Sequence, residues 1–211
     1  MKLREIPVHF LPLALPPANS ISNMNINTKI KDWIKDDPMR WQALEIAAAL
    51  ELKDWCLAAG FVRNLVWDKL HHYPQPTPLS DIDLIYFDPS DISPERDAYF
   101  ETSLRSRSAL NWSVKNQARM HLRNNDHPYL NTLDAMSYWV EIETAVGVQL
   151  SVTGELLILA PFGLNGLSQL TITLNDTRPK PADFLARITK KRWLETWPQL
   201  KLINNSLLTD I

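Results

Sequence analysis

Hydrophobic residues recur along much of the chain at the three- and four-residue spacing that is typical of amphipathic helices. From Pro38 onward, Trp41, Leu44 and Ala48 follow this spacing, and a proline in the first turn favours a helix start. A second segment stops before the cluster of Pro74, Pro76 and Pro78, because proline cannot continue a helix. The pattern predicts helices over residues 38–51, 63–72, 93–104, 132–139 and 181–193.

Other apolar runs are short and rich in residues that favour β-structure. Residues 55–59 form such a run and end at Gly60, and residues 81–87 and 110–120 are predicted as two further strands. Residues 146–150 and 155–159 flank Thr153-Gly154, which predicts a hairpin. Because strands and helices alternate before this hairpin, we expect an α/β (α+β) fold with a mixed sheet flanked by helices.

The two ends of the chain differ from the middle. Residues 1–35 are predicted to form a proline-rich, mobile N-terminal extension, residues 36–200 one folded domain, and residues 201–211 a C-terminal tail. Prolines and Glu5 interrupt the apolar residues near the N-terminus, which argues against a secretory signal. No stretch approaches the roughly 20 apolar residues that would span a bilayer, so we expect no membrane partner.

Charge and cysteine content narrow the class of protein. The 211 residues include 22 Lys and Arg against 24 Asp and Glu, so no overall field steers the chain to nucleic acid or membrane. Cys56 is the single cysteine, which excludes an internal disulfide and a cysteine-built metal site. We therefore expect a cytoplasmic protein.

Asp81 and Asp83 form the most specific local feature. Successive side chains of a strand point to opposite faces, so the two carboxylates share one face and Ile82 takes the other. Two like charges this close repel each other unless a cation lies between them. Oxygen ligands of this kind suit Mg²⁺ or Mn²⁺, and Mg²⁺ often bridges to substrate phosphates. A solvent-exposed start of a strand is the alternative interpretation.

A glycine turn precedes the acid pair. Gly60 follows the apolar run of residues 55–59, and a predicted helix then begins with Arg63 and Asn64. Amide groups at a helix N-terminus favour phosphate, and an arginine adds two parallel donors. Gly60, Arg63 and Asn64 are therefore predicted to bind the phosphates of a ligand beside the metal. Taken alone, Gly60 would be a turn glycine and Arg63 a surface cation.

Several blocks of residues together support a family resemblance. Residues 59–68 (AGFVRNLVWD) and 81–88 (DIDLIYFD) resemble the bacterial nucleotidyltransferase-like proteins of the polymerase-β superfamily. The resemblance continues through residues 112–121, 144–148 and 160–164. It implies a nucleotidyltransferase fold and the transfer of a nucleoside monophosphate from a nucleoside triphosphate, with Asp81 and Asp83 as catalytic metal ligands. The acceptor, whether small molecule, RNA or protein, is left open.

Two departures from the superfamily pattern concern catalysis. Phe61 follows the turn glycine, where the superfamily has a small residue, and Ser113 stands where a third carboxylate is expected. Glu141 and Glu143 are alternative sources of that carboxylate, and Glu141 fits the family pattern better. The simpler interpretation, which we favour for both, is an acid pair in solvent at the end of a helix. Asp88, before Pro89, is expected to cap a turn.

Basic residues are concentrated after residue 101. If residues 110–120 form one strand, Lys115, Gln117 and Arg119 share a face, and we predict that Lys115 and Arg119 contact phosphates. A solvated sheet face is an equal alternative for these residues. The last predicted helix carries a basic run, for which a solvated helix face is favoured: Arg187, Lys190, Lys191 and Arg192. The sequence thus supports a metal-dependent nucleotidyltransferase, or a nucleotide- or protein-binding module that keeps the fold without turnover.

Overall fold

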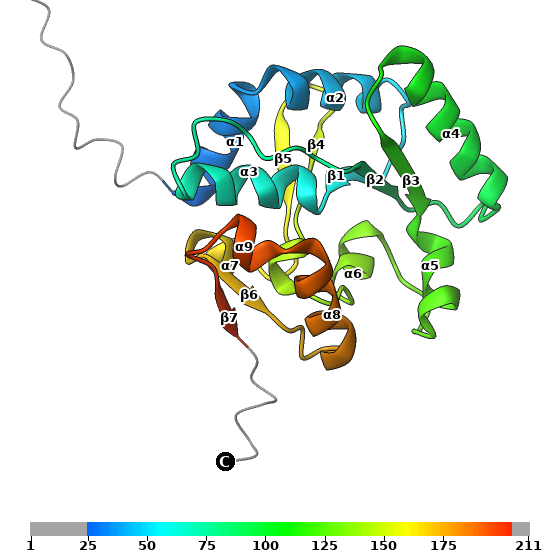
Figure 1. The fold of residues 1–211 in the computed structure, drawn as a ribbon. Helices are drawn as coiled ribbons and strands as arrows, with labels where there is room; N and C mark the ends of the chain where they lie inside the picture. The colour runs from blue at the N-terminus through cyan, green and yellow to red at the C-terminus, as the bar shows by residue number, and fades with distance from the viewer. Residues whose placement is uncertain (1–24, 204–211) are drawn as a thin grey trace, which may run out of the picture.

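A five-stranded mixed sheet forms the centre of the protein (Figure 1). The computed structural model describes residues 25–203. The strands are β1 (Trp55–Ala58), β2 (Ile82–Tyr86), β3 (Trp112–Asn116), β4 (Gly147–Leu150) and β5 (Leu156–Leu159). Their order in the sheet is β3-β2-β1-β4-β5, in which only β2 and β3 are parallel to each other. The predicted mixed α/β sheet is confirmed.

Four helices lie on one side of this sheet, the upper side in Figure 1. They are α1 (Ile26–Lys35), α2 (Pro38–Ala48), α3 (Gly60–Leu70) and α4 (Pro94–Arg107). Alternation along the strands turns Leu57, Leu84 and Val114 toward them, and all three side chains are completely buried. Burial of this apolar face supplies the main core, at roughly 25 cal/mol for each Å² removed from water.

The remaining elements gather on the other side of the sheet (Figure 1). They are α5 (Gln117–Asn124), α6 (Thr132–Met136), the 3₁₀ helix Ile142–Thr144, α7 (Asn165–Ser168), α8 (Pro181–Lys191), α9 (Trp193–Thr196) and the parallel pair β6 (Thr171–Thr173) and β7 (Lys201–Ile203). On this face, Cys56, Ala58 and Ile85 form a second, smaller apolar cluster with Met136. The cluster covers only part of the sheet, so the polar positions Asp83 and Lys115 lie beside a cavity.

The structure differs from the predicted domain boundaries at both ends. Residues Ile26–Lys35, assigned to the mobile extension, form helix α1, whose Ile30 and Ile34 are completely buried in the main core. At the other end, Lys201–Ile203 pair with β6 instead of belonging to a free tail. The rest of both predicted segments, residues 1–24 and 204–211, lies outside the described residues.

The predicted strand over residues 110–120 is wrong in its second half. Strand β3 ends at Asn116, and helix α5 begins at Gln117. The Asn116 side chain accepts a hydrogen bond from the amide of Ala118 at 3.1 Å, which caps the new helix. The same side chain donates to the carbonyl oxygens of Asp88 and Asp91 at 2.8 and 2.9 Å. Tertiary contacts at one buried asparagine therefore decide where the strand stops.

Among residues 25–203, no helix combines the length and the apolar character needed to cross a membrane.

Candidate active site

Asp81 and Asp83 lie at the edge of a cavity, as the alternation along the strand predicts. Asp83 is the second residue of β2, between Ala58 of β1 and Ser113 of β3, and Asp81 directly precedes the strand. Ile82 and Leu84 point the other way into the main core. Burial and then the charge of Asp81 raise the pKa of the Asp83 carboxyl above its ordinary value. The two acids are therefore close enough to repel each other.

Ser113 occupies the neighbouring strand position where a third acid was expected. It is paired with Asp83 in the sheet, and its hydrogen bond to Asp83 partly offsets the rise in that carboxyl's pKa. Within residues 25–203, no group of three His, Cys, Asp or Glu side chains is arranged to hold a metal ion. The protein therefore offers two carboxylates and a hydroxyl at this point.

Two carboxylates are sufficient for Mg²⁺ when a substrate supplies further oxygens. Mg²⁺ keeps several waters and is commonly held by one or two carboxylates together with substrate phosphates. Burial and then the charge of Asp81 raise the pKa of Asp83, and a bound cation would stabilise the ionised carboxylate against both effects. The donor set of Asp81 and Asp83 thus fits a divalent cation that arrives with a phosphate ligand.

Helix α3 begins at Gly60, directly beside the acid pair. The preceding Ala59 has a φ of 55°, which turns the chain sharply out of β1 into the helix. Gly60 and Asn64, at the N-terminus of this helix, line the same cavity as the acid pair. Their predicted role in binding phosphate stays a prediction.

Arg63 has a more structural environment than the sequence predicted. Its guanidinium donates to Thr144 Oγ1 at 2.8 Å and to Asn64 Oδ1 at 3.0 Å. It also lies against the rings of Trp67 and Trp193, with 5.1 and 4.5 Å from the guanidinium carbon to the ring centroids. Burial lowers the pKa of Arg63 to about 10, an effect that the charge of Glu141 partly offsets. Arg63 lines the cavity, and its buried Nε has no hydrogen-bond partner among the described residues.

Glu141 does not join the acid pair. It is almost fully buried and bound by Arg187 of α8, whose Nε donates to Glu141 Oε1 at 2.6 Å. Glu143 is also buried and accepts hydrogen bonds from Thr171 and Thr173 of β6. The favoured expectation that both acids lie in solvent is therefore wrong, and so is the placement of Glu141 with the other two metal ligands.

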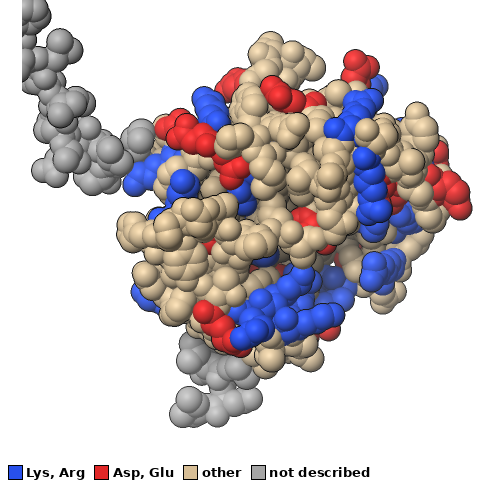
Figure 2. All heavy atoms as spheres, turned by 45° about the horizontal axis from the view of Figure 1, so that its top comes forward, with Lys and Arg blue, Asp and Glu red and all other residues tan. Residues whose placement is uncertain are grey.

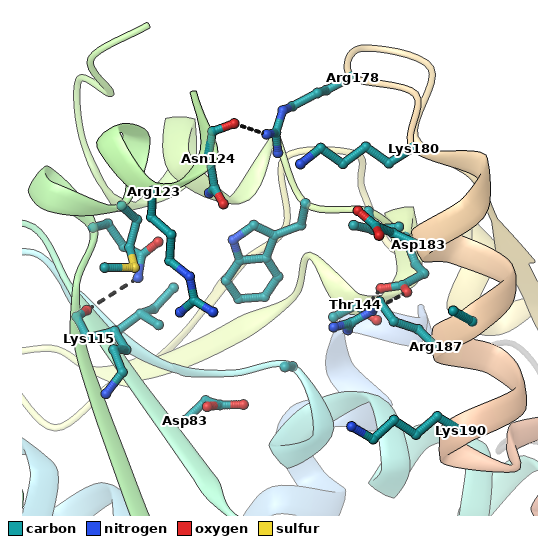
Figure 3. Close-up of a pocket in the computed structure, with 18 residues that line it drawn as sticks. Asp83, Lys115, Arg123, Asn124, Thr144, Arg178, Lys180, Asp183, Arg187 and Lys190 are labelled. Atoms are coloured by element: carbon teal, nitrogen blue, oxygen red, sulfur yellow. Dashed lines mark hydrogen bonds and ion pairs between the residues drawn. The ribbon is translucent and has the colours of Figure 1, made fainter. Parts of the chain in front are cut away.

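Arg119 is the second predicted residue that the structure removes from the site. Because α5 replaces the end of the predicted strand, Arg119 turns to Asp97 of α4, with which it forms an ion pair. It also donates to the carbonyl oxygen of Ile92 at 2.9 Å. Lys115 stays on β3 and lines the cavity next to Asp83 (Figure 3). Asp88 accepts from the amide and hydroxyl of Ser90, as expected of a residue that caps a turn.

Two cavities meet at the acid pair. The first, of about 490 Å³, includes Gly60, Asn64 and both acids, and helix α8 closes it with Lys190 and Lys191. The second, of about 540 Å³, extends away from Asp83 between α5 and α8 and includes Trp139. Both have the size of small-molecule sites. The two share the boundary residues Ala59, Asp83, Arg187 and Lys190.

Cations surround the second cavity. Figure 3 shows Lys115 and Arg123 on one side, Arg178 and Lys180 above, and Arg187 and Lys190 on the α8 side. Figure 2 shows Lys and Arg side chains gathered around a hollow in the lower part of the face turned to the viewer. The sequence favoured a solvated face for the basic run of α8, and Lys190, Lys191 and Arg192 are exposed. Arg187, Lys190 and Lys191 also line the cavities. Arg123, Arg178 and Lys180 had no sequence signal beyond the excess of basic residues after residue 101.

Comparison with known proteins agrees with this geometry. A family model described as nucleotidyltransferase matches residues 45–202, and hence both acids and helix α8. The chain belongs to this nucleotidyltransferase family. A solved structure described as a CCA-adding enzyme head domain is 32% identical, with a TM-score of 0.72 over 84% of this chain and 96% of that one. A search of curated protein sequences finds no significant match.

Two solved structures of lower identity share the fold alone. A CCA-adding enzyme solved with CTP is 12% identical, with a TM-score of 0.51 over 85% of this chain. A complex of a tRNA-processing enzyme is 14% identical, with a TM-score of 0.50 over 76% of this chain. This chain spans 43% and 42% of the length of those two proteins. The match to the head domain, in contrast, covers 84% of this chain and 96% of that one.

Proposed function

We propose that this protein transfers a nucleoside monophosphate from a nucleoside triphosphate to an acceptor hydroxyl. The observation that carries the proposal is the position of Asp81 and Asp83 between a helix N-terminus and the cationic helix α8. A triphosphate needs positive charge and amide donors on its oxygens and a divalent cation between its phosphates. These elements line one cavity of about 490 Å³. The family and the CTP bound to one distant relative support a nucleotide donor.

The residues have separate roles in this proposal. Asp81 and Asp83 would hold Mg²⁺ or Mn²⁺, and the ion would neutralise charge on the triphosphate when bound. The amides from Gly60 onward, with Asn64, Lys190 and Lys191, bind the outer phosphates. The acceptor oxygen forms a bond to the α-phosphorus while the bond from that phosphorus to pyrophosphate breaks. The hydroxyl proton is lost to water, and pyrophosphate leaves.

The test measures donor binding and turnover separately. Equilibrium binding of a non-hydrolysable triphosphate with Mg²⁺ is compared in wild type, Asp81→Asn and Asp83→Asn, and pyrophosphate release is followed with a panel of acceptors. We expect either substitution to abolish Mg²⁺-dependent binding and release, while Asp91→Asn, an exposed acid outside the cavities, leaves both unchanged. Binding that survives in both variants would show that the acid pair is not the metal site.

A second candidate function is a binding module without turnover. Ser113 in place of a third acid, and Glu141 held by Arg187, favour it. The same experiment separates the two functions, because a module binds the triphosphate through Asp81 and Asp83 and releases no pyrophosphate with any acceptor.

A further inference from the structure

The two cavities meet at Asp83, one of the two acids proposed to hold the metal ion. Asp83 borders both, whereas Asp81, Gly60 and Asn64 border only the smaller one. In phosphoryl-type transfer the attacking and leaving oxygens lie roughly in line on opposite sides of the phosphorus. If pyrophosphate leaves on the side of Gly60, the acceptor hydroxyl must approach from the other side. That side is the larger cavity.

The chemistry of the larger cavity indicates what it holds. Its lining includes six cations and three acids, the acids being Asp83, Glu141 and Asp183. Arg187 is paired with Glu141, and Arg178 with Asp126. In the part of the chain that the structure describes, Arg123, Lys180 and Lys190 take part in none of the ion pairs. Figure 3 shows these three pointing into the cavity from different walls.

Together with Lys115, these residues are four lining cations that take part in none of the ion pairs of the described residues, so the cavity favours an anionic ligand. Because they lie on different walls, they give the whole cavity a positive potential, which suits a ligand that carries a phosphate group. The volume of about 540 Å³ suits a small molecule, and Trp139 with Ile85 and Met120 adds an apolar wall. The whole chain carries a net charge of -2, which lacks the excess of basic residues that a long nucleic-acid track needs.

We infer that the larger cavity is the acceptor site and takes a small phosphorylated compound with a free hydroxyl, such as a sugar phosphate or a nucleoside monophosphate. The inference rests on the proposed function and names its second substrate. Arg123, Lys180 and Lys190 supply the positive charge around the phosphorylated compound, and its hydroxyl lies near Asp83. Lys190 borders both cavities, so Arg123 and Lys180 are the residues that test the acceptor site alone.

The experiment first fills the donor site. Wild-type protein is saturated with a non-hydrolysable triphosphate and Mg²⁺, and this binding is recorded by itself. Ribose 5-phosphate and adenosine 5′-monophosphate are then titrated, beside ribose, adenosine and a single-stranded oligoribonucleotide. We expect the two phosphorylated probes to bind and the two unphosphorylated ones to bind at least about tenfold more weakly. The two phosphorylated arms distinguish a sugar phosphate from a nucleotide.

Variants connect the binding to the cavity. Arg123→Gln and Lys180→Gln should each weaken the phosphorylated probes about tenfold and leave the triphosphate affinity unchanged. Lys53→Gln, an exposed lysine outside both cavities, is the matched control. The inference is overturned if neither phosphorylated probe binds, if both variants behave like Lys53→Gln, if the triphosphate displaces the probes, or if the oligonucleotide alone binds. Loss of triphosphate binding in wild type would instead contradict the proposed function.

Discussion

Asp68 in helix α3 accepts a 2.8 Å hydrogen bond from the indole nitrogen of Trp197, 129 residues further along the chain. The same carboxylate accepts from the amide and hydroxyl of Thr77, at 2.8 and 2.6 Å. Thr77 lies in the segment that leads to Asp81, and Trp197 directly follows α9. One buried carboxylate therefore connects three walls of the smaller cavity.

Replacing Asp68 by alanine should lower the free energy of unfolding by about 2–4 kcal/mol, because three donors lose their acceptor. Asp68→Asn keeps one acceptor oxygen, so its free energy of unfolding should fall by less than that of Asp68→Ala. Denaturant unfolding of the two variants measures both effects. A free energy of unfolding within about 0.5 kcal/mol of wild type for Asp68→Ala would contradict the role of this carboxylate.

Stability without metal should depend on pH through Asp83. Because burial and Asp81 raise the pKa of this carboxyl in the folded state, the folded protein binds its proton more tightly than the unfolded chain does. The ionised carboxylate therefore costs stability, and this cost grows as pH rises from the ordinary pKa through the raised one. Asp83→Asn removes the cost, so its stability relative to wild type should increase across that window and remain equal or higher at neutral pH. Denaturant unfolding between pH 3 and pH 8, in buffer with chelator, measures the difference. A variant that is less stable at neutral pH would refute the prediction.

Replacement by alanine should affect stability strongly at one glycine and little at another. A Cβ on Gly147 would lie 2.4 Å from Cys56 Sγ in the neighbouring strand, so Gly147→Ala should cost about 1–3 kcal/mol. On Gly60 the nearest atom is Arg63 Nη2 at 3.5 Å, which is ordinary contact, so Gly60→Ala should stay within about 1 kcal/mol of wild type. The methyl group would nevertheless enter the smaller cavity and weaken triphosphate binding. Thermal unfolding and titration of the two variants separate the packing effect from the binding effect.

Glu141→Gln tests whether this acid contributes to metal binding. Because its carboxylate is engaged with Arg187, we expect the Mg²⁺ concentration for half-maximal triphosphate binding to stay within about twofold of wild type. The free energy of unfolding should fall by about 1–3 kcal/mol, because the Arg187 guanidinium loses the buried carboxylate with which it is paired. A large rise in the Mg²⁺ requirement would restore Glu141 as a third ligand.

The acid pair could be predicted from the sequence because its signal is local. Strand periodicity places Asp81 and Asp83 on one face and Ile82 and Leu84 on the other, and the structure has the same arrangement. The predicted roles of Asp81, Asp83, Gly60 and Asn64 in binding stay predictions. Arg119 was misplaced because Asn116 ends its strand through contacts to Asp88 and Asp91, which are distant in sequence.

Other elements gave weaker local signals. Helix α1 carries Ile26, Ile30 and Ile34 at four-residue spacing, but it directly follows the proline-rich segment and was included in it. Strands β6 and β7 have three residues each and pair over a long separation, so no local pattern marks them. The position of Arg123, Lys180 and Lys190 around one cavity depends on the packing of α5 and α8 around the sheet. Periodicity gives no information on that packing.

Helix α8 is late in the chain, although the acids that it faces are early. On a ribosome, the sheet residues around Asp83 leave the exit tunnel long before Arg187, Lys190 and Lys191 are synthesised. Both cavities then lack one wall, because α8 borders each of them. Substrate binding therefore depends on completion of the C-terminal part of the domain, and an incomplete nascent chain presents the acid pair to solvent without the cations that oppose it.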